Sequence, residues 1–171
     1  DGGTAAAGEV RRRILREARA LGALSHPHAA TLYRVHDLGE QGCALELELL
    51  EGGTLEASLS GGRRLPASEA LPALHGVASC LRAAHAAHLV HGDVKPANVM
   101  RTADGRVKLV DFGLARLLGR THPSSTVAAA AGTPHYLAPE LVEGGPSSPA
   151  SDVWSLGALA YRLLAGRLPF D

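Results

Sequence analysis

The stretch from His91 to Asn98, taken together with Asp111, constrains this sequence more than any other feature. It reads HGDVKPAN, directly follows the apolar pair Leu89-Val90, and contains Asp93, Lys95 and Asn98. Asp111 follows in the short sequence VDFG. Phosphoryl transfer depends mainly on positioning and charge neutralisation. It therefore needs a carboxylate to accept a hydroxyl proton, oxygen atoms to hold a metal and a cation for phosphate charge. These residues together are typical of a phosphoryl-transfer site.

Length and composition limit the class of protein. The 171 residues suffice for one full-sized domain with a buried core, but not for two ordinary ones. With 46% hydrophobic and 20% charged residues, the chain is too apolar for wholesale disorder. A net charge of zero gives no reason to expect nucleic acid as a partner. From the first residues we expect no signal peptide, and the most apolar run (153–165) is too short to be a membrane segment. We therefore expect a cytoplasmic protein.

The first third of the chain predicts one helix and two strands. Apolar residues at alternating four- and three-residue steps indicate a helix over about 8–25, and the segments 32–38 and 45–49 read as antiparallel strands, the second half-buried. Glu17 interrupts the apolar stripe of that helix. A carboxylate there is costly unless a cation meets it. The alternative is a solvated Glu17 that pairs with Arg13 one turn back.

The remainder is predicted to be mostly helical after a break at 51–53. A long helix should cover about 66–88, with one apolar side formed by Leu71, Leu74, Val77, Ala78, Leu81 and Ala84. Short strands are expected at 99–101 and 107–110 around the hairpin signal Asp104-Gly105. A last helix should begin with Ser151 as its cap and end before Gly166.

Five motifs stand in the order and at the spacing of one known family. They are HGDVKPAN at 91–98, DFG at 111–113, GTPHYL at 132–137, APE at 138–140 and DVWSLG at 152–157. In these segments the chain resembles the catalytic domain of eukaryotic-type (Hanks-type) serine/threonine protein kinases of the bacterial kind. Five linked motifs make chance a negligible explanation. The resemblance covers nearly all of the chain, but only the middle of the family's domain, so we expect a catalytic domain truncated at both ends.

The resemblance implies a role for each residue of the site. Asp93 corresponds to the base that accepts the proton of the substrate hydroxyl, and Lys95 and Thr133 correspond to residues that mark serine/threonine kinases. Asn98 and Asp111 correspond to the magnesium ligands, and both offer the hard oxygen atoms that Mg²⁺ prefers. The implied cofactors are ATP and Mg²⁺, and the implied partners are proteins with Ser or Thr hydroxyl groups.

The resemblance also implies a nucleotide pocket and a bilobal α+β fold. Leu47 corresponds to the gatekeeper, the backbones of Glu48 and Leu50 to the adenine-binding groups, Met100 to the pocket floor, and Glu17 to the helix-C glutamate. The implied division is a partial N-lobe at 1–50, with helix C, antiparallel strands and the hinge, and a mostly helical partial C-lobe at 51–171. The family's stacked regulatory spine is matched by four residues: Leu21, Leu32, His91 and Phe112. Asp152 corresponds to the residue that anchors the base of this spine.

The sequence departs from the family pattern in two places. Gly92 stands where most regulated members have an arginine that holds a phosphorylated activation loop. No glycine-rich phosphate loop and no lysine precede Lys95, so Glu17 has no strand lysine to pair with in this sequence. Because positioning of the nucleotide phosphates is a large part of this catalysis, we expect residues 1–171 alone to be inactive.

Three other interpretations stay open at this point. A pseudokinase or scaffold would use the same fold without catalysis. A small-molecule phosphotransferase of the aminoglycoside or choline type shares the His-Gly-Asp loop, although Lys95 and the segment 132–140 argue against it. His85, His88 and His91, at three-residue steps, could mimic a zinc cluster, but no cysteine or acid completes one.

Overall fold

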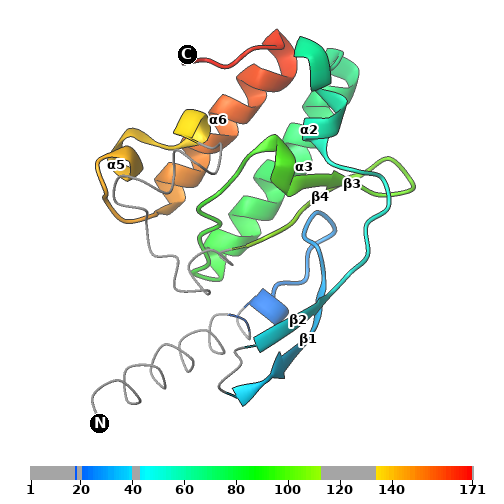
Figure 1. Ribbon diagram of the computed structural model, residues 1–171, viewed down its shortest axis with the longest axis vertical. Coiled ribbons are helices and arrows are strands. Elements are labelled where there is room, and N and C mark those ends of the chain that lie inside the picture. The colour runs from blue at the N-terminus through cyan, green and yellow to red at the C-terminus, as the bar shows by residue number, and fades with distance from the viewer. Residues whose placement is uncertain (1–17, 19–20, 40–42, 113–133, 171) are drawn as a thin grey trace.

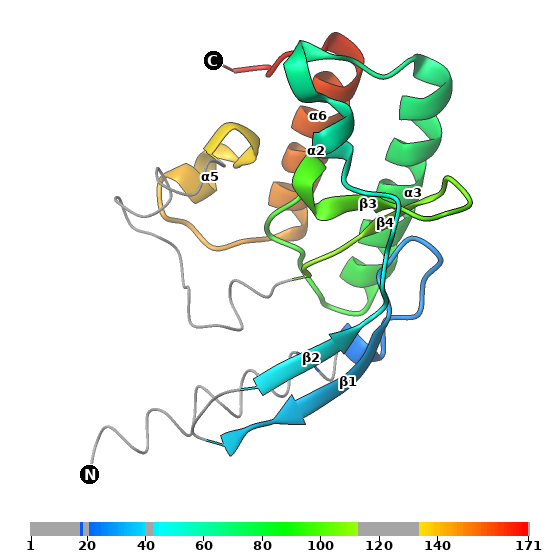
Figure 2. The ribbon, with the colours of Figure 1, turned by 45° about the vertical axis from the view of Figure 1, so that its right-hand side comes forward.

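The computed structural model describes residues 18, 21–39, 43–112 and 134–170. Its elements are β1 (Leu32–Asp37), β2 (Cys43–Leu47), α2 (Leu55–Ser58), η2 (Ser60–Gly62), α3 (Ala67–Ala86), η3 (Pro96–Asn98), β3 (Val99–Arg101), β4 (Val107–Leu109), η4 (Pro134–Tyr136), α5 (Pro139–Val142) and α6 (Pro149–Ala165). Two small antiparallel sheets and several helices confirm the predicted α+β class. Figures 1 and 2 show the β1–β2 hairpin lying apart from the group formed by α3, α6 and β3–β4. The division at residues 50 and 51 stays a prediction.

The first sheet pairs β1 with β2 from Leu32–Leu47 to Asp37–Cys43. The antiparallel pairing agrees with the prediction, but β2 begins and ends two residues earlier than predicted. The expectation of a half-buried strand is wrong at its end, since Leu47 is 39% and Leu49 is 82% exposed. Leu49 lies beyond the last cross-strand pair, so β1 cannot cover it. Most of the predicted helix over 8–25 lies outside the described residues.

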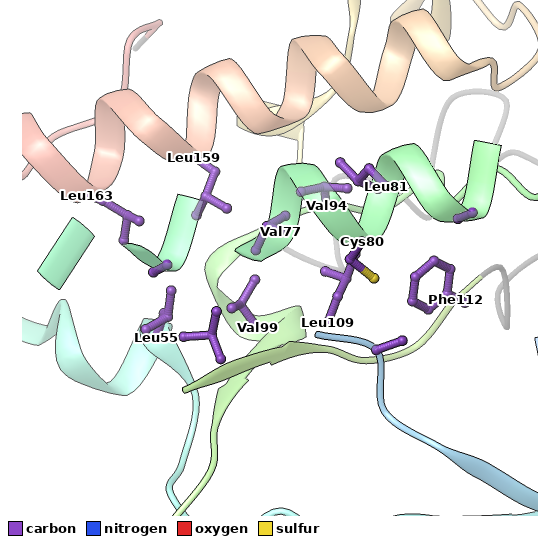
Figure 3. Packing of buried hydrophobic residues seen from close by; sticks show 14 of the residues in the cluster. Leu55, Val77, Cys80, Leu81, Val94, Val99, Leu109, Phe112, Leu159 and Leu163 are labelled. Atoms are coloured by element: carbon purple, nitrogen blue, oxygen red, sulfur yellow. The ribbon is translucent and has the colours of Figure 1, made fainter. Parts of the chain in front are cut away.

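The main core lies between α3, α6 and the β3–β4 hairpin. Figure 3 shows Leu159 and Leu163 of α6 on one side of α3, and Leu55, Val99 and Leu109 on the other side. The buried side of α3 consists mostly of small residues: Ala70, Ala73, Gly76, Val77, Cys80, Leu81 and Ala84. These small residues let the neighbouring elements approach the helix closely. Leu71 was wrongly predicted for this side, because it points away from the core and is 58% exposed.

A short segment at 26–30 joins the N-terminal part of the chain to this core. The Leu109 N–H donates to the His28 carbonyl (2.8 Å), and the Ala30 N–H donates to the Leu109 carbonyl (3.0 Å). The His28 ring packs so closely on α3 that a Cβ on Gly76 would lie 2.6 Å from its Nδ1. The same Nδ1 lies 2.7 Å from the Val107 carbonyl, to which it donates a hydrogen bond. Glycine at position 76 is therefore needed for this connection.

The last helix begins one turn earlier than predicted. Ser148, not Ser151, is the N-cap of α6, and the two serines form a reciprocal capping box with Pro149 at the first helical position. Ser151 was a plausible cap from the sequence, but it occupies the third position of that box. The helix ends as predicted at Gly166, which has a φ of 75°. In the described ranges, no helix is both long and apolar enough to cross a membrane.

Candidate active site

The loop between α3 and β3 brings Asp93, Lys95 and Asn98 together. The Lys95 Nζ lies 2.7 Å from the Asp93 Oδ2. The Asn98 Nδ2 donates to the same Oδ2 (3.0 Å) and to the Asp93 carbonyl (2.8 Å). The side chain of Asp93 is 34% exposed, so a solvent-borne substrate can reach it. The three residues predicted to act together in the loop are thus in contact.

A single buried carboxylate holds this loop in place. Asp152, in the first turn of α6, is 1% exposed. It accepts hydrogen bonds from the backbone N–H groups of His91 (2.9 Å) and Gly92 (2.7 Å), and its Oδ2 lies 2.8 Å from the His85 Nε2. His85, one of the three histidines considered for zinc, therefore supports the aspartate. The described residues contain no group of three His, Cys, Asp or Glu side chains that could hold a metal ion.

His91 is a neutral residue that positions the loop. Its Nδ1 accepts the Asp93 N–H (3.2 Å), so the proton must be on Nε2, which donates to the Val110 carbonyl (2.9 Å). Burial lowers the pKa of His91, against the opposing influence of the Val110 hydrogen bond and the nearby carboxylates. Phe112 packs edge-on against the ring, with centroids 4.7 Å apart. His91 thus links Asp93 to the segment that carries Asp111.

Asp111 follows β4 directly and has an unusual backbone conformation. Its φ of 61° is in the left-handed region, which residues other than glycine rarely adopt. The Val110 N–H donates to the Asn98 carbonyl (2.9 Å), so the chain at Asp111 runs beside the chain at Asn98. Strained backbone of this kind concentrates at functional sites. The geometry is therefore consistent with a shared role for Asn98 and Asp111.

A cavity of about 310 Å³ lies beside these residues, within the range of small-molecule sites. It is lined by Leu21, Ala30, Leu47, Glu48, Leu49, Leu50, Ala97, Met100, Val110, Asp111 and Phe112. The apolar side chains suit a flat ring, while backbone groups of segment 47–50 can recognise its edge. Among the described residues, none hydrogen-bonds to the Glu48 carbonyl or the Leu50 N–H. The predicted pocket residues Leu47, Glu48, Leu50 and Met100 thus all border one cavity.

Two predicted site residues, Glu17 and Thr133, lie outside the described residues. Two features of the site were missed from the sequence. His85 was considered only as a metal ligand, and Lys108, whose Nζ lies 2.6 Å from the Glu48 Oε2, was not considered at all. A signal for Lys108 existed, because it is one of only two lysines in the chain and stands between apolar residues in a short strand.

The donor atoms at the site fit Mg²⁺ better than zinc. The amide nitrogen of Asn98 is directed to Asp93, which leaves its Oδ1 as the free donor atom, and the exposed carboxylate of Asp111 supplies further oxygen atoms. Mg²⁺ typically binds few protein carboxylates and completes its shell with water and substrate phosphates. Asn98 and Asp111 thus offer the type of oxygen donor that this ion prefers.

Comparison with known proteins gives a consistent result. The family model described as the protein kinase domain matches residues 4–171. Serine/threonine-protein kinase PknA of Mycobacterium tuberculosis is 40% identical over 165 residues, which are 92% of this chain and 37% of PknA. PknL of the same species is 43% identical over 160 residues (92% of this chain, 39% of PknL). Serine/threonine-protein kinase pkn2 of Myxococcus xanthus is 41% identical over 166 residues (93% of this chain, 20% of pkn2).

The chain thus spans less than two fifths of the length of each of these relatives. The match covers nearly all of its residues, including the loop at 91–98, the segment around Asp111 and α6. The chain belongs to the protein kinase family, as its motifs predicted.

Proposed function

We propose that this chain carries the catalytic region of a serine/threonine protein kinase, which transfers the γ-phosphate of ATP to Ser or Thr hydroxyl groups of proteins. The observation that carries the proposal is the contact of Asp93 with Lys95 and Asn98, next to the cavity bordered by Asp111. The names of the relatives support the same substrate class. A cytoplasmic location and the absence of a nucleic-acid partner remain predictions from the sequence.

In this proposal Asp93 accepts the proton of the substrate hydroxyl. Its Oδ2 is occupied by Lys95 and Asn98, whereas its Oδ1 makes no hydrogen bond with any described residue. The Oδ1 atom is therefore available to a hydroxyl group that approaches from solvent. The Lys95 ammonium group, close by, offsets the negative charge that gathers on the phosphate oxygens during transfer.

In the same proposal, residues on two walls of the cavity would hold the nucleotide and its metal. The Glu48 carbonyl and the Leu50 N–H would bind the adenine edge between apolar walls that include Met100. Asn98 Oδ1 and the Asp111 carboxylate would hold Mg²⁺, which neutralises phosphate charge when it is bound. Roles for Glu17 and Thr133 remain proposals from the family resemblance alone.

The proposal is tested with the Asp93→Asn variant of the full-length protein that contains this chain. Asn keeps the shape of the side chain and its contact with Asn98, but it cannot accept the hydroxyl proton. Phosphate transfer from ATP and Mg²⁺ to a Ser/Thr peptide should fall in kcat by about 10²–10⁴-fold, with little change in KM for ATP. The matched control is Asp104→Asn, the same chemical change in the exposed β3–β4 hairpin, which should leave kcat unchanged.

Three results would contradict the proposal. Undiminished transfer by Asp93→Asn would remove Asp93 from the reaction. Preferential transfer to an aminoglycoside or choline by the parent protein would instead favour the small-molecule phosphotransferase. A parent protein that binds ATP but transfers nothing would favour the scaffold.

A further inference from the structure

An ion pair joins the β4 strand to the end of β2. Lys108 stands in the middle of β4, and its Nζ lies 2.7 Å from Oε1 and 2.6 Å from Oε2 of Glu48. The two side chains are only 13% and 20% exposed. A contact to both oxygens at this depth is less screened by solvent than an ordinary surface pair.

Glu48 is also held by its neighbour across the sheet. Its Oε2 accepts the Thr31 N–H (3.0 Å), and its own N–H donates to the Thr31 carbonyl (2.9 Å). Burial disfavours the charged carboxylate, but the hydrogen bonds from Lys108 and Thr31 outweigh burial and lower the pKa of Glu48. The carboxylate is therefore ionised at neutral pH, and the attraction to Lys108 persists.

The pair connects the two segments that supply opposite walls of the cavity. Glu48 belongs to the segment 47–50, which forms one wall, while Lys108 is the cross-strand partner of Met100 on the other wall. Figure 2 shows the chain leaving β2 and passing β3 on its way to α2. Side-chain packing adds little to the position of this segment, because Leu47 and Leu49 are exposed. Lys108 itself does not line the cavity.

We propose that Lys108 is a positioning residue for nucleotide binding, which sets the distance between the segment 47–50 and Met100 through Glu48. This inference rests on the proposed function, since it assigns the adenine edge to the Glu48 carbonyl and the Leu50 N–H. Without the ion pair, the segment samples wider positions, and only a fraction of molecules present both groups correctly. Apparent affinity falls in proportion to that fraction.

The test measures binding of ATP with Mg²⁺, and separately of adenosine, to the full-length protein by calorimetry. Lys108→Met keeps the aliphatic stem and removes the charge. It should weaken both ligands by about tenfold, a usual size for coupling between contacting residues. Lys108→Arg keeps the charge and should stay within about twofold of the parent. Arg106→Met, which breaks an exposed ion pair in the same hairpin, is the matched control and should bind as the parent does.

A double-mutant cycle shows whether Lys108 acts through Glu48. Glu48→Gln alone and the Glu48→Gln/Lys108→Met double variant should lose about as much affinity as Lys108→Met, because all three break the same contact. The double variant leaves no unpaired charge near the core. If urea unfolding shows that Lys108→Met does not fold, the double variant is therefore used in its place.

Each remaining result overturns the inference in a recognisable way. Parent-like binding of both ligands by folded Lys108→Met would mean that the pair is only structural. Loss of ATP affinity with unchanged adenosine affinity would mean that Lys108 acts on the phosphates. Additive losses in the double variant would separate Lys108 from Glu48. A parent protein that binds neither ligand would overturn the proposed function as well.

Discussion

The two sides of the cavity are held in different ways. One side carries Asp93 and Asp111, and we name it the catalytic side after the proposed function. It is tied to the core by buried groups, since His91, Phe112 and Asp152 are at most 6% exposed. The hinge side, formed by β1, β2 and residues 47–50, has much of its apolar surface in solvent, including Tyr33 at 63% and Leu49 at 82% exposed. A partly buried ion pair between Glu48 and Lys108 ties this side to β4.

This difference separates two properties that a substitution can change. On the catalytic side, the groups that position Asp93 also hold the fold together, so stability and catalysis should fail together. On the hinge side, a substitution removes few buried contacts. Ligand affinity can therefore change while the free energy of unfolding stays nearly constant. Regions with few buried apolar contacts open most easily in folded proteins.

The largest expected effect is that of Asp152→Ala. The change leaves two backbone N–H groups and the His85 ring without their acceptor inside the core. We expect the free energy of unfolding, measured by urea unfolding, to fall by about 3–5 kcal/mol. Phosphate transfer should be lost as well. Asp104→Ala in the exposed hairpin is the control and should leave transfer intact. A stable Asp152→Ala variant would show that the buried network is not what fixes the catalytic side.

A smaller effect is expected from Gly92→Ala. Gly92 has a φ of 77°, and a Cβ there would lie 3.3 Å from the Ser147 Oγ. Left-handed backbone costs a residue with a Cβ about 1–2 kcal/mol, and the shift should also displace Asp93 and lower kcat. Gly105→Ala is the matched control, because Gly105 has a φ of 83° but its Cβ would have open space around it.

Both glycine variants should lose similar stability in urea unfolding, but only Gly92→Ala should lose kcat. An equal loss of kcat in the two variants would mean that general destabilisation explains the effect. Unchanged kcat in Gly92→Ala would mean that the loop tolerates a shift next to its base. Either result would contradict the expectation that the same groups control both stability and catalysis on the catalytic side.

Local patterns predicted much of the catalytic side. Asp93, Lys95 and Asn98 lie close together in the sequence, so one short loop is enough to bring them into contact. The family resemblance also named Asp152 as an anchor, although its partners at His85 and the loop backbone appear only in the structure. Glu17 and Thr133, in contrast, lie outside the described residues, and their roles stay predictions.

Long-range pairs and exact helix faces could not be predicted in this way. Glu48 and Lys108 are 60 residues apart, and alternation in a short strand does not identify which partner a charged side chain meets. On α3 the large Leu71 was expected inside, but close packing against neighbouring elements favoured the small residue Ala70. At α6, Ser148 and Ser151 are both capping residues, and only the backbone shows which one is the cap.

The smallest expected effect is that of Leu49→Ser, which tests the hinge side of the comparison most directly. Leu49 borders the cavity, but the residue as a whole is 82% exposed. We therefore expect its backbone, rather than its side chain, to form this part of the wall. We expect the free energy of unfolding to stay within about 0.5 kcal/mol of the parent value and ATP affinity to stay nearly unchanged. Met100→Ser is the control on the facing wall, where a half-buried side chain should cost about 1 kcal/mol of stability and weaken ATP binding. Equal loss of affinity in the two variants, measured by calorimetry, would mean that exposed hinge side chains close over the bound nucleotide. The hinge side would then bind the nucleotide through side-chain packing gained on binding, rather than through the backbone position that Glu48 and Lys108 maintain.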